Sequence, residues 1–217
     1  MRALEAELRA GLDVLALDLT DTQVASLLDY LALIGKWTRV YNLTAVRDPE
    51  EMLTHHLLDS LAAVTPLRRH LADSGKSTGA KLLDVGSGAG LPGVVFAICC
   101  PDLAVDCVDT VAKKAAFIQQ AAVSLKLPRL RGVHARVEAL AGPYDVVSSR
   151  AFASLVDFTQ WSGPALAEQG VWLAMKGKHP VDEVAALPAN VEVFHVEPLA
   201  VPGLDAQRCI VWMRRRR

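Results

Sequence analysis

The chain has few cysteines, and none of them has the spacing of a metal-binding or redox motif. The 217-residue sequence contains four cysteines, and no two of them are separated by two residues. Structural zinc sites and thioredoxin-like centres use such pairs. We therefore expect no metal site, and we expect reduced thiols packed in the core at Cys99, Cys100, Cys107 and Cys209.

Long apolar runs are also missing. The longest run, VVFAICC, covers only residues 94–100, whereas a membrane-spanning helix needs about 20 apolar residues. The N-terminal stretch MRALEAELRAGLDV carries acids among its apolar residues and lacks the pattern of a signal peptide. These absences predict a soluble, cytoplasmic protein that does not contact membranes.

Neither sign of charge is in excess. Lys and Arg together number 23, Asp and Glu number 24, and the net charge is -1. A general nucleic-acid coat protein would be strongly basic, so that class is disfavoured, whereas a local basic patch stays open. The arginine run at residues 214–217 is either such a phosphate contact or a solvated tail.

What the chain does contain falls into two sections, of which the first, residues 1–73, has helical patterns. Thr20 and Gln23 fit a capping box, and apolar residues follow them at helical spacing. Asp48 before Pro49 predicts a second helix start, because an acid caps the first turn and proline suits its first position.

The second section, residues 81–217, follows a small polar linker at 72–80 and alternates short apolar runs with helical stretches. This alternation predicts an α/β domain with a mostly parallel seven-stranded sheet and helices on both faces, preceded by an N-terminal helical extension. The last two strands are joined by a short connection, so they must pair antiparallel. Strands are expected at 81–85, 104–109, 131–135, 144–149, 170–176, 191–199 and 208–213.

A glycine-rich loop follows the first expected strand in LLDVGSGAGLPG, residues 82–93. In doubly wound sheets, ligands bind at the carboxyl ends of the strands, and a glycine loop that opens a helix offers bare backbone N–H groups. Asp109 ends the second strand about 20 residues after Gly90, the spacing of an acid that binds ribose hydroxyls. A nucleoside-containing cofactor is therefore predicted.

Two classes of cofactor fit this loop. Gly88, Gly90 and Gly93 satisfy the dinucleotide fingerprint, so an NAD(P)-dependent reductase stays an alternative. The longer frame D-x-G-x-G-x-G, which starts at Asp84, resembles S-adenosylmethionine-dependent methyltransferases, and no second domain remains to hold a reducible substrate. In that interpretation the amides of Gly86, Gly88 and Gly90 face the methionine part, Asp84 lies near its ammonium group, and Asp109 binds the ribose.

The ends of the next strands supply further candidates. Val137 would pack on the adenine ring, and Glu138 or its backbone would accept from the exocyclic amine, unless Glu138 is an ordinary surface acid. Arg150 would contact the cofactor or a phosphate, or else form a surface ion pair. Lys176 points into the cleft or is a solvated lysine. Arg150 and Lys176 are the candidates for a catalytic role, which stays unassigned.

Few sequence features indicate which atom accepts the methyl group. The segment SSRAFAS, residues 148–154, lacks the prolines typical of enzymes that methylate exocyclic base amines. Cys100 precedes Pro101 at the far end of a helix, which does not fit a cysteine nucleophile. The absence of a placed base favours an atom with a free lone pair, such as guanine N7.

Four segments, KWTRVYNLTAVRDPEEMLTHHLLDSL, LLDVGSGAGLPG, SRAFASL and MKGK, together resemble the RsmG (GidB) family. These are bacterial guanine-N7 methyltransferases of small-subunit ribosomal RNA, and the resemblance covers nearly the whole chain. It implies a Rossmann-like class I methyltransferase fold, S-adenosylmethionine as cofactor, and a guanine in the decoding region of 16S rRNA as substrate. By position, it assigns cofactor binding to Gly86, Leu91, Val137, Glu138 and Arg150.

The resemblance also gives the helical section a role as the RNA-side wall of the cleft. His56 shares one helix face with Asp59 and Ser60, and the loop before that helix carries Asn42 and Arg47. His56 is otherwise a core histidine, and His55 stands where the family commonly has a basic residue. No protein partner is expected; a small-molecule methyltransferase and a non-catalytic ribosome-assembly factor stay alternatives. The expected RNA-binding residues are Asn42, Arg47, His56 and Lys176.

Overall fold

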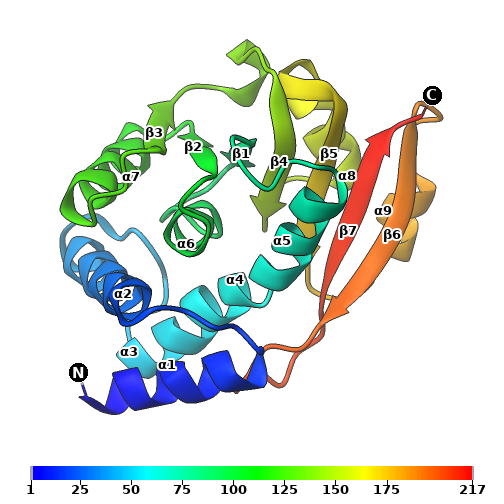
Figure 1. Cartoon of the computed structure of the whole chain (residues 1–217). Coiled ribbons are helices and arrows are strands. Elements are labelled where there is room, and N and C mark those ends of the chain that lie inside the picture. Colours follow the sequence, from blue (N-terminus) through cyan, green and yellow to red (C-terminus); the bar gives the residue numbers. More distant parts are fainter. Residues whose placement is uncertain (1, 217) are drawn as a thin grey trace.

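A twisted seven-stranded sheet forms the centre of the molecule, shown in Figure 1 as a computed structural model that describes residues 2–216. The strand order is β3-β2-β1-β4-β5-β7-β6, with β1 to β5 parallel and β7 antiparallel to both of its neighbours. This confirms the predicted mostly parallel sheet and the antiparallel final pair. The strands are β1 Lys81–Val85, β2 Ala104–Asp109, β3 Leu130–His134, β4 Tyr144–Arg150, β5 Leu166–Lys176, β6 Val191–Leu199 and β7 Arg208–Arg215.

Helices cover both faces of this sheet. Because successive strand side chains point to opposite faces, Leu82 packs into one hydrophobic cluster and Leu83 into another. The first cluster includes α6 (Gly93–Cys99) and α7 (Ala112–Ser124), and the second includes α8 (Leu155–Ser162). The remaining elements of this part are the short helix α9 and the 3-10 turns η2 and η3, at Val181–Ala185, Val137–Ala139 and Gly163–Ala165.

The N-terminal helices pack against the α6 and α7 side of the sheet. Their apolar residues belong to the same hydrophobic cluster as α6 and α7, so one continuous core joins the helical section to the sheet. The polypeptide passes into β1 through turns that follow Asp73. The helices are α1 Arg2–Val14, α2 Asp21–Tyr41, α3 Pro49–Met52, the π-helix η1 Leu53–Leu58, α4 Asp59–Leu61 and α5 Val64–Asp73.

Both predicted helix starts are present. Thr20 caps α2, and it forms a reciprocal capping box with Gln23. Asp48 caps α3 by accepting the N–H groups of Glu50 and Glu51. Within residues 2–216, no helix combines the length and the apolar character required to cross a membrane. Met1 and Arg217 lie outside the described residues. They are the first residue of the expected helical section and the last residue of the expected arginine tail.

Candidate active site

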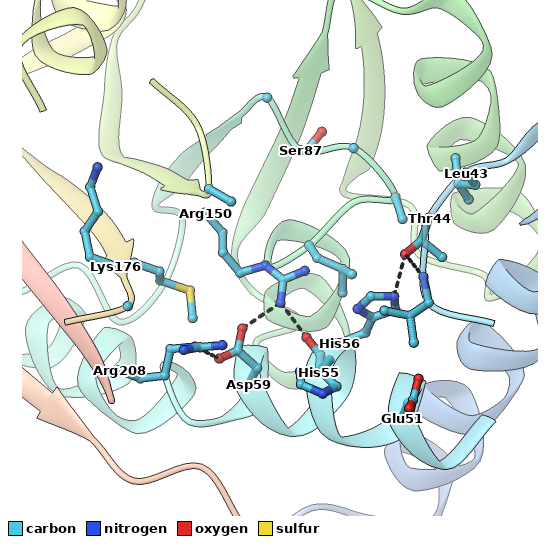
Figure 2. Close-up of a pocket in the computed structure, with 18 residues that line it drawn as sticks. Leu43, Thr44, Glu51, His55, His56, Asp59, Ser87, Arg150, Lys176 and Arg208 are labelled. Atoms are coloured by element: carbon cyan, nitrogen blue, oxygen red, sulfur yellow. Dashed lines mark hydrogen bonds and ion pairs between the residues drawn. The ribbon is translucent and has the colours of Figure 1, made fainter. Parts of the chain in front are cut away.

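A cavity of about 660 Å³ opens at the carboxyl ends of the parallel strands (Figure 2); we call it the edge cavity. One wall is the glycine loop after β1, and the facing wall is the helical stretch from α3 through η1 to α4. The ends of β4 and β5 and the start of β7 complete it. The lining residues are Leu43, Thr44, Val46, Glu51, His55, His56, Asp59, Gly86, Ser87, Gly88, Ala89, Leu91, Arg150, Ala151, Met175, Lys176, Gly177 and Arg208.

The glycines of the loop serve different purposes. Gly88 has φ +57°, and an added Cβ would have no neighbouring atom within 4 Å, because it would enter the open cavity. An added Cβ at Gly90 would overlap the Val94 side chain, so this glycine allows close packing of the loop on α6. Gly86 and Leu91 line the cavity, whereas Gly90 is not among the lining residues. The contact of all three with a cofactor stays a prediction.

Asp84 lies beneath the loop. Its side chain shares the sheet face of Leu82, which is the α6 face, and it is fully buried. One carboxylate oxygen accepts the Gly93 N–H at 3.0 Å, and the other accepts the Ser148 hydroxyl at 2.9 Å. Burial raises the pKa of Asp84 to about 7. Asp84 does not line the edge cavity, so the geometry favours a bracing role, and its contact with a ligand stays a prediction.

Asp109 holds the loop from the neighbouring strand. Its carboxylate accepts the Gly88 N–H at 3.1 Å and the Val111 N–H at 2.8 Å, and Lys114 Nζ lies 3.7 Å away. Val137 is buried in the second hydrophobic cluster and Glu138 is exposed. These three predicted cofactor residues do not line the edge cavity, so their roles stay predictions.

Asp59 joins two arginines across the cavity floor (Figure 2). Arg150 Nη1 donates to Asp59 Oδ2 at 2.6 Å and to the His55 carbonyl at 2.8 Å, and Arg208 Nε donates to Asp59 Oδ1 at 2.9 Å. Arg150 therefore lines the cavity and forms an ion pair with Asp59, while its contact with a cofactor or phosphate stays a prediction. Arg208 was missed, because nothing in the sequence links it to an acid 149 positions away.

His56 lies beside this cluster and is neutral at pH 7. Burial, and secondarily the charge of Arg150, lower the pKa of His56 to about 4. Its Nε2 lies 3.0 Å from the Thr44 hydroxyl, and its Nδ1 has no hydrogen-bond partner among residues 2–216. The side chain lines the edge cavity but is only 6 % exposed. It therefore has features of both predicted alternatives, a core histidine and a residue of the cavity wall.

Comparison with known proteins identifies the family. The family described as rRNA small subunit methyltransferase G, also called GidB, matches residues 23–211. The chain belongs to this family. It is 73 % identical over 214 residues to "Ribosomal RNA small subunit methyltransferase G" of Polaromonas sp. strain JS666, an alignment that covers 99 % of this chain and 95 % of the relative. The predicted resemblance is confirmed.

Solved structures confirm the fold expected for a GidB methyltransferase. TrmN from Thermus thermophilus superposes with a TM-score of 0.56 at 18 % identity, covering 76 % of this chain and 53 % of that one. A SAM-dependent methyltransferase from Aquifex aeolicus gives a TM-score of 0.53 at 15 % identity, covering 76 % and 98 %. At these identities the similarity establishes the Rossmann-like architecture and nothing further.

The remaining predicted residues of this GidB chain lie at different distances from the cavity. Lys176 lines it, but Figure 2 shows its side chain extending away from Arg150. Lys176 Nζ donates to Glu183 of α9 at 2.8 Å and to the Ala153 carbonyl at 3.3 Å. Lys176 thus lines the cavity while its ammonium group forms an ion pair with a helix that the sequence did not indicate, and its contact with RNA stays a prediction.

Asn42 and Arg47 are not brought to the edge cavity. Both are exposed, and Arg47 Nη2 donates to Asn42 Oδ1 at 2.7 Å. Arg47 lines a separate cavity of about 420 Å³ against α1, α2 and α3. Their contact with RNA stays a prediction. Over residues 2–216, no group of three or more His, Cys, Asp or Glu side chains is arranged to hold a metal ion.

Proposed function

We propose that this chain transfers a methyl group from S-adenosylmethionine to N7 of a guanine in 16S rRNA of the small ribosomal subunit. Membership of the rRNA small subunit methyltransferase G family supports the substrate. The guanine N7 atom and the decoding region come from the sequence resemblance. Acting on ribosomal RNA would place the enzyme in the cytoplasm, with the small subunit as its partner.

The observation that carries the proposal is the glycine loop facing an open cavity. At Gly88 a side chain would project into this cavity, so the bare backbone leaves room for a ligand at the end of β1. When bound there, S-adenosylmethionine supplies an electrophilic methyl group. The residues that we propose to hold it are Asp84, Gly86, Gly88, Gly90, Leu91, Asp109, Val137, Glu138 and Arg150.

The chain's contribution to the reaction is alignment of the acceptor atom with the methyl group. Guanine N7 carries a free lone pair and loses no proton on methylation, so the site needs no general base. His56 is neutral but buried, and Asp59 is bonded to two arginines. Arg150, anchored by Asp59 and the His55 carbonyl, orients the reactants without proton transfer.

The substrate RNA would approach over the helical wall. His56 forms part of the cavity lining, and Lys176 would exchange Glu183 for a phosphate when RNA is bound. Asn42 and Arg47, exposed beside the start of α3, would contact the RNA outside the cavity. None of these roles requires a metal or a protein partner.

The test is incubation of small ribosomal subunits with the protein and methyl-labelled S-adenosylmethionine, followed by nucleoside analysis. We expect label in 7-methylguanosine of the 16S RNA. Label only at another atom would reject guanine N7. Calorimetry with NAD(P) and S-adenosylmethionine separates the reductase alternative, and binding of subunits without turnover would indicate an assembly factor instead.

A further inference from the structure

The edge cavity contains two carboxylates in very different states. Asp59 is 3 % exposed and fully engaged by Arg150 and Arg208. Glu51 is exposed, and its carboxylate has no hydrogen-bond or ion-pair partner within residues 2–216. Of these two carboxylates, Glu51 is therefore the one that remains available to a ligand.

Glu51 stands on the wall opposite the glycine loop. Glu51, His55 and Asp59 follow one another at intervals of four residues along α3, η1 and α4, and all three line the cavity. Figure 2 shows this helical stretch facing the loop that carries Ser87, with Glu51 on its first turn. A ligand between the two walls would meet the loop on one edge and Glu51 on the other.

A guanine that is methylated at N7 must direct its five-membered ring toward the methyl donor. Its opposite edge, with the N1–H and the 2-amino group, then points away from the donor. These donors lose water when the base enters the cavity, and unpaired buried donors are costly. An ionised carboxylate only accepts hydrogen bonds, and it can accept two at once.

We propose that Glu51 recognises the acceptor base by accepting hydrogen bonds from the N1–H and the 2-amino group of guanine. This inference rests on the proposed function, and it assigns the choice of guanine to one residue. Glu51 also lies in the first turn of α3, where its negative charge interacts favourably with the positive end of the helix dipole. Glu50 occupies the same turn but does not line the edge cavity. A variant at Glu50 therefore tests the effect on the helix dipole without an effect on base recognition.

The test uses small subunits reassembled around 16S RNA with either guanosine or inosine at the acceptor position found in the labelling experiment. Inosine keeps N7 and lacks only the 2-amino group. Initial rates of methyl transfer to N7 are measured for wild type, Glu51→Gln and Glu50→Gln. Wild type and Glu50→Gln should prefer guanosine by about tenfold or more. Glu51→Gln should be slower on guanosine and should lose most of that preference.

The outcomes distinguish this inference from the function on which it rests. If wild type methylates guanosine N7 but Glu51→Gln keeps the wild-type preference, Glu51 does not read the base. Equal rates of wild type on guanosine and inosine would overturn the inference as well. Absence of N7 transfer by folded wild type would reject the proposed function itself, and the inference with it. Thermal unfolding of each variant confirms folding, and Glu51→Asp, which retains a carboxylate, should keep part of the preference.

Discussion

At the scale of single residues, three glycines of one loop are required for three different reasons. Gly86 faces the Phe152 ring, which an added Cβ would overlap, and Gly90 lets the loop pack closely on Val94. Only Gly88 faces open space. A sequence pattern that requires glycine at each position therefore does not reveal which glycine faces the ligand.

Gly88→Ala tests the ligand-facing position. The added methyl group would enter the cavity, so we expect the affinity for S-adenosylmethionine to fall at least about tenfold, or about 1.4 kcal/mol. Alanine in the left-handed conformation also costs about 1–2 kcal/mol of folding stability. Calorimetry measures the first effect and urea unfolding the second.

Gly79→Ala is the matched control for this prediction. Gly79 has φ +74°, and an added Cβ would also have no atom within 4 Å, but it lies in the turn before β1, outside the edge cavity. It should show a similar loss of stability with unchanged cofactor affinity. If the two variants bind S-adenosylmethionine equally well, the cofactor does not lie against Gly88.

The sequence predicted some site residues better than others. Arg150 and the loop follow from position, because strand ends meet at one edge of the sheet. The direction of the Asp84 side chain could have been inferred from the sequence, because it lies two positions after Leu82 in the strand. Residues two positions apart share one face, which here is the α6 face. The pairing of Asp59 with Arg208 has no local signal, because it depends on packing of distant segments.

At the scale of elements, Asp84 connects three of them. From β1 it bonds to the first residue of α6 and to Ser148 of β4, beneath the glycine loop. Because burial raises its pKa from 3.8 to about 7, the folded chain retains this proton at pH values where the unfolded chain has lost it. The contribution of Asp84 to stability is therefore complete below about pH 4 and is lost as the pH rises through about 7.

Asp84→Asn removes this titration. Its amide can still accept the Gly93 N–H and donate to the Ser148 hydroxyl. Relative to this variant, wild type should lose more than about 1 kcal/mol of unfolding free energy between pH 5 and pH 8, since one pKa unit corresponds to about 1.4 kcal/mol. Urea unfolding at both pH values gives the difference, and Glu50→Gln controls for the loss of an exposed acid. Parallel pH profiles of wild type and Asp84→Asn would contradict the assignment.

The π-helix, the start of β5 and the place of β7 in the sheet were not predicted from the sequence. The π-helix Leu53–Leu58 follows normal helical spacing in its buried residues, and the change of hydrogen-bond pattern leaves no compositional mark. β5 begins at Leu166, four positions before the expected start: Leu166 pairs with Tyr144 of β4, and the register then shifts before Val171 pairs with Val146. β7 lies between β5 and β6. This order depends on which strands pair in the folded chain, and hydrophobic periodicity does not predict it.

At the scale of the whole molecule, the helical section and the sheet share one hydrophobic core and build one cavity. The glycine loop comes from the sheet and the facing wall from the helical section, and Arg150 and Arg208 are bonded across them to Asp59. The helices of the first section and the strands of the second were expected from the sequence. The resemblance placed the helical section beside the cleft, but individual contacts between the two sections, such as that of Asp59 with Arg208, were not predicted.

We propose that the whole molecule methylates one guanine of 16S RNA at N7. This activity is tested most directly by nucleoside mass spectrometry and position mapping of 16S RNA from cells with and without the gene. We expect deletion to remove a single 7-methylguanosine and the wild-type gene to restore it. An unchanged 7-methylguanosine content after deletion, or the loss of a different methylated nucleoside, would contradict methylation at guanine N7 by this protein.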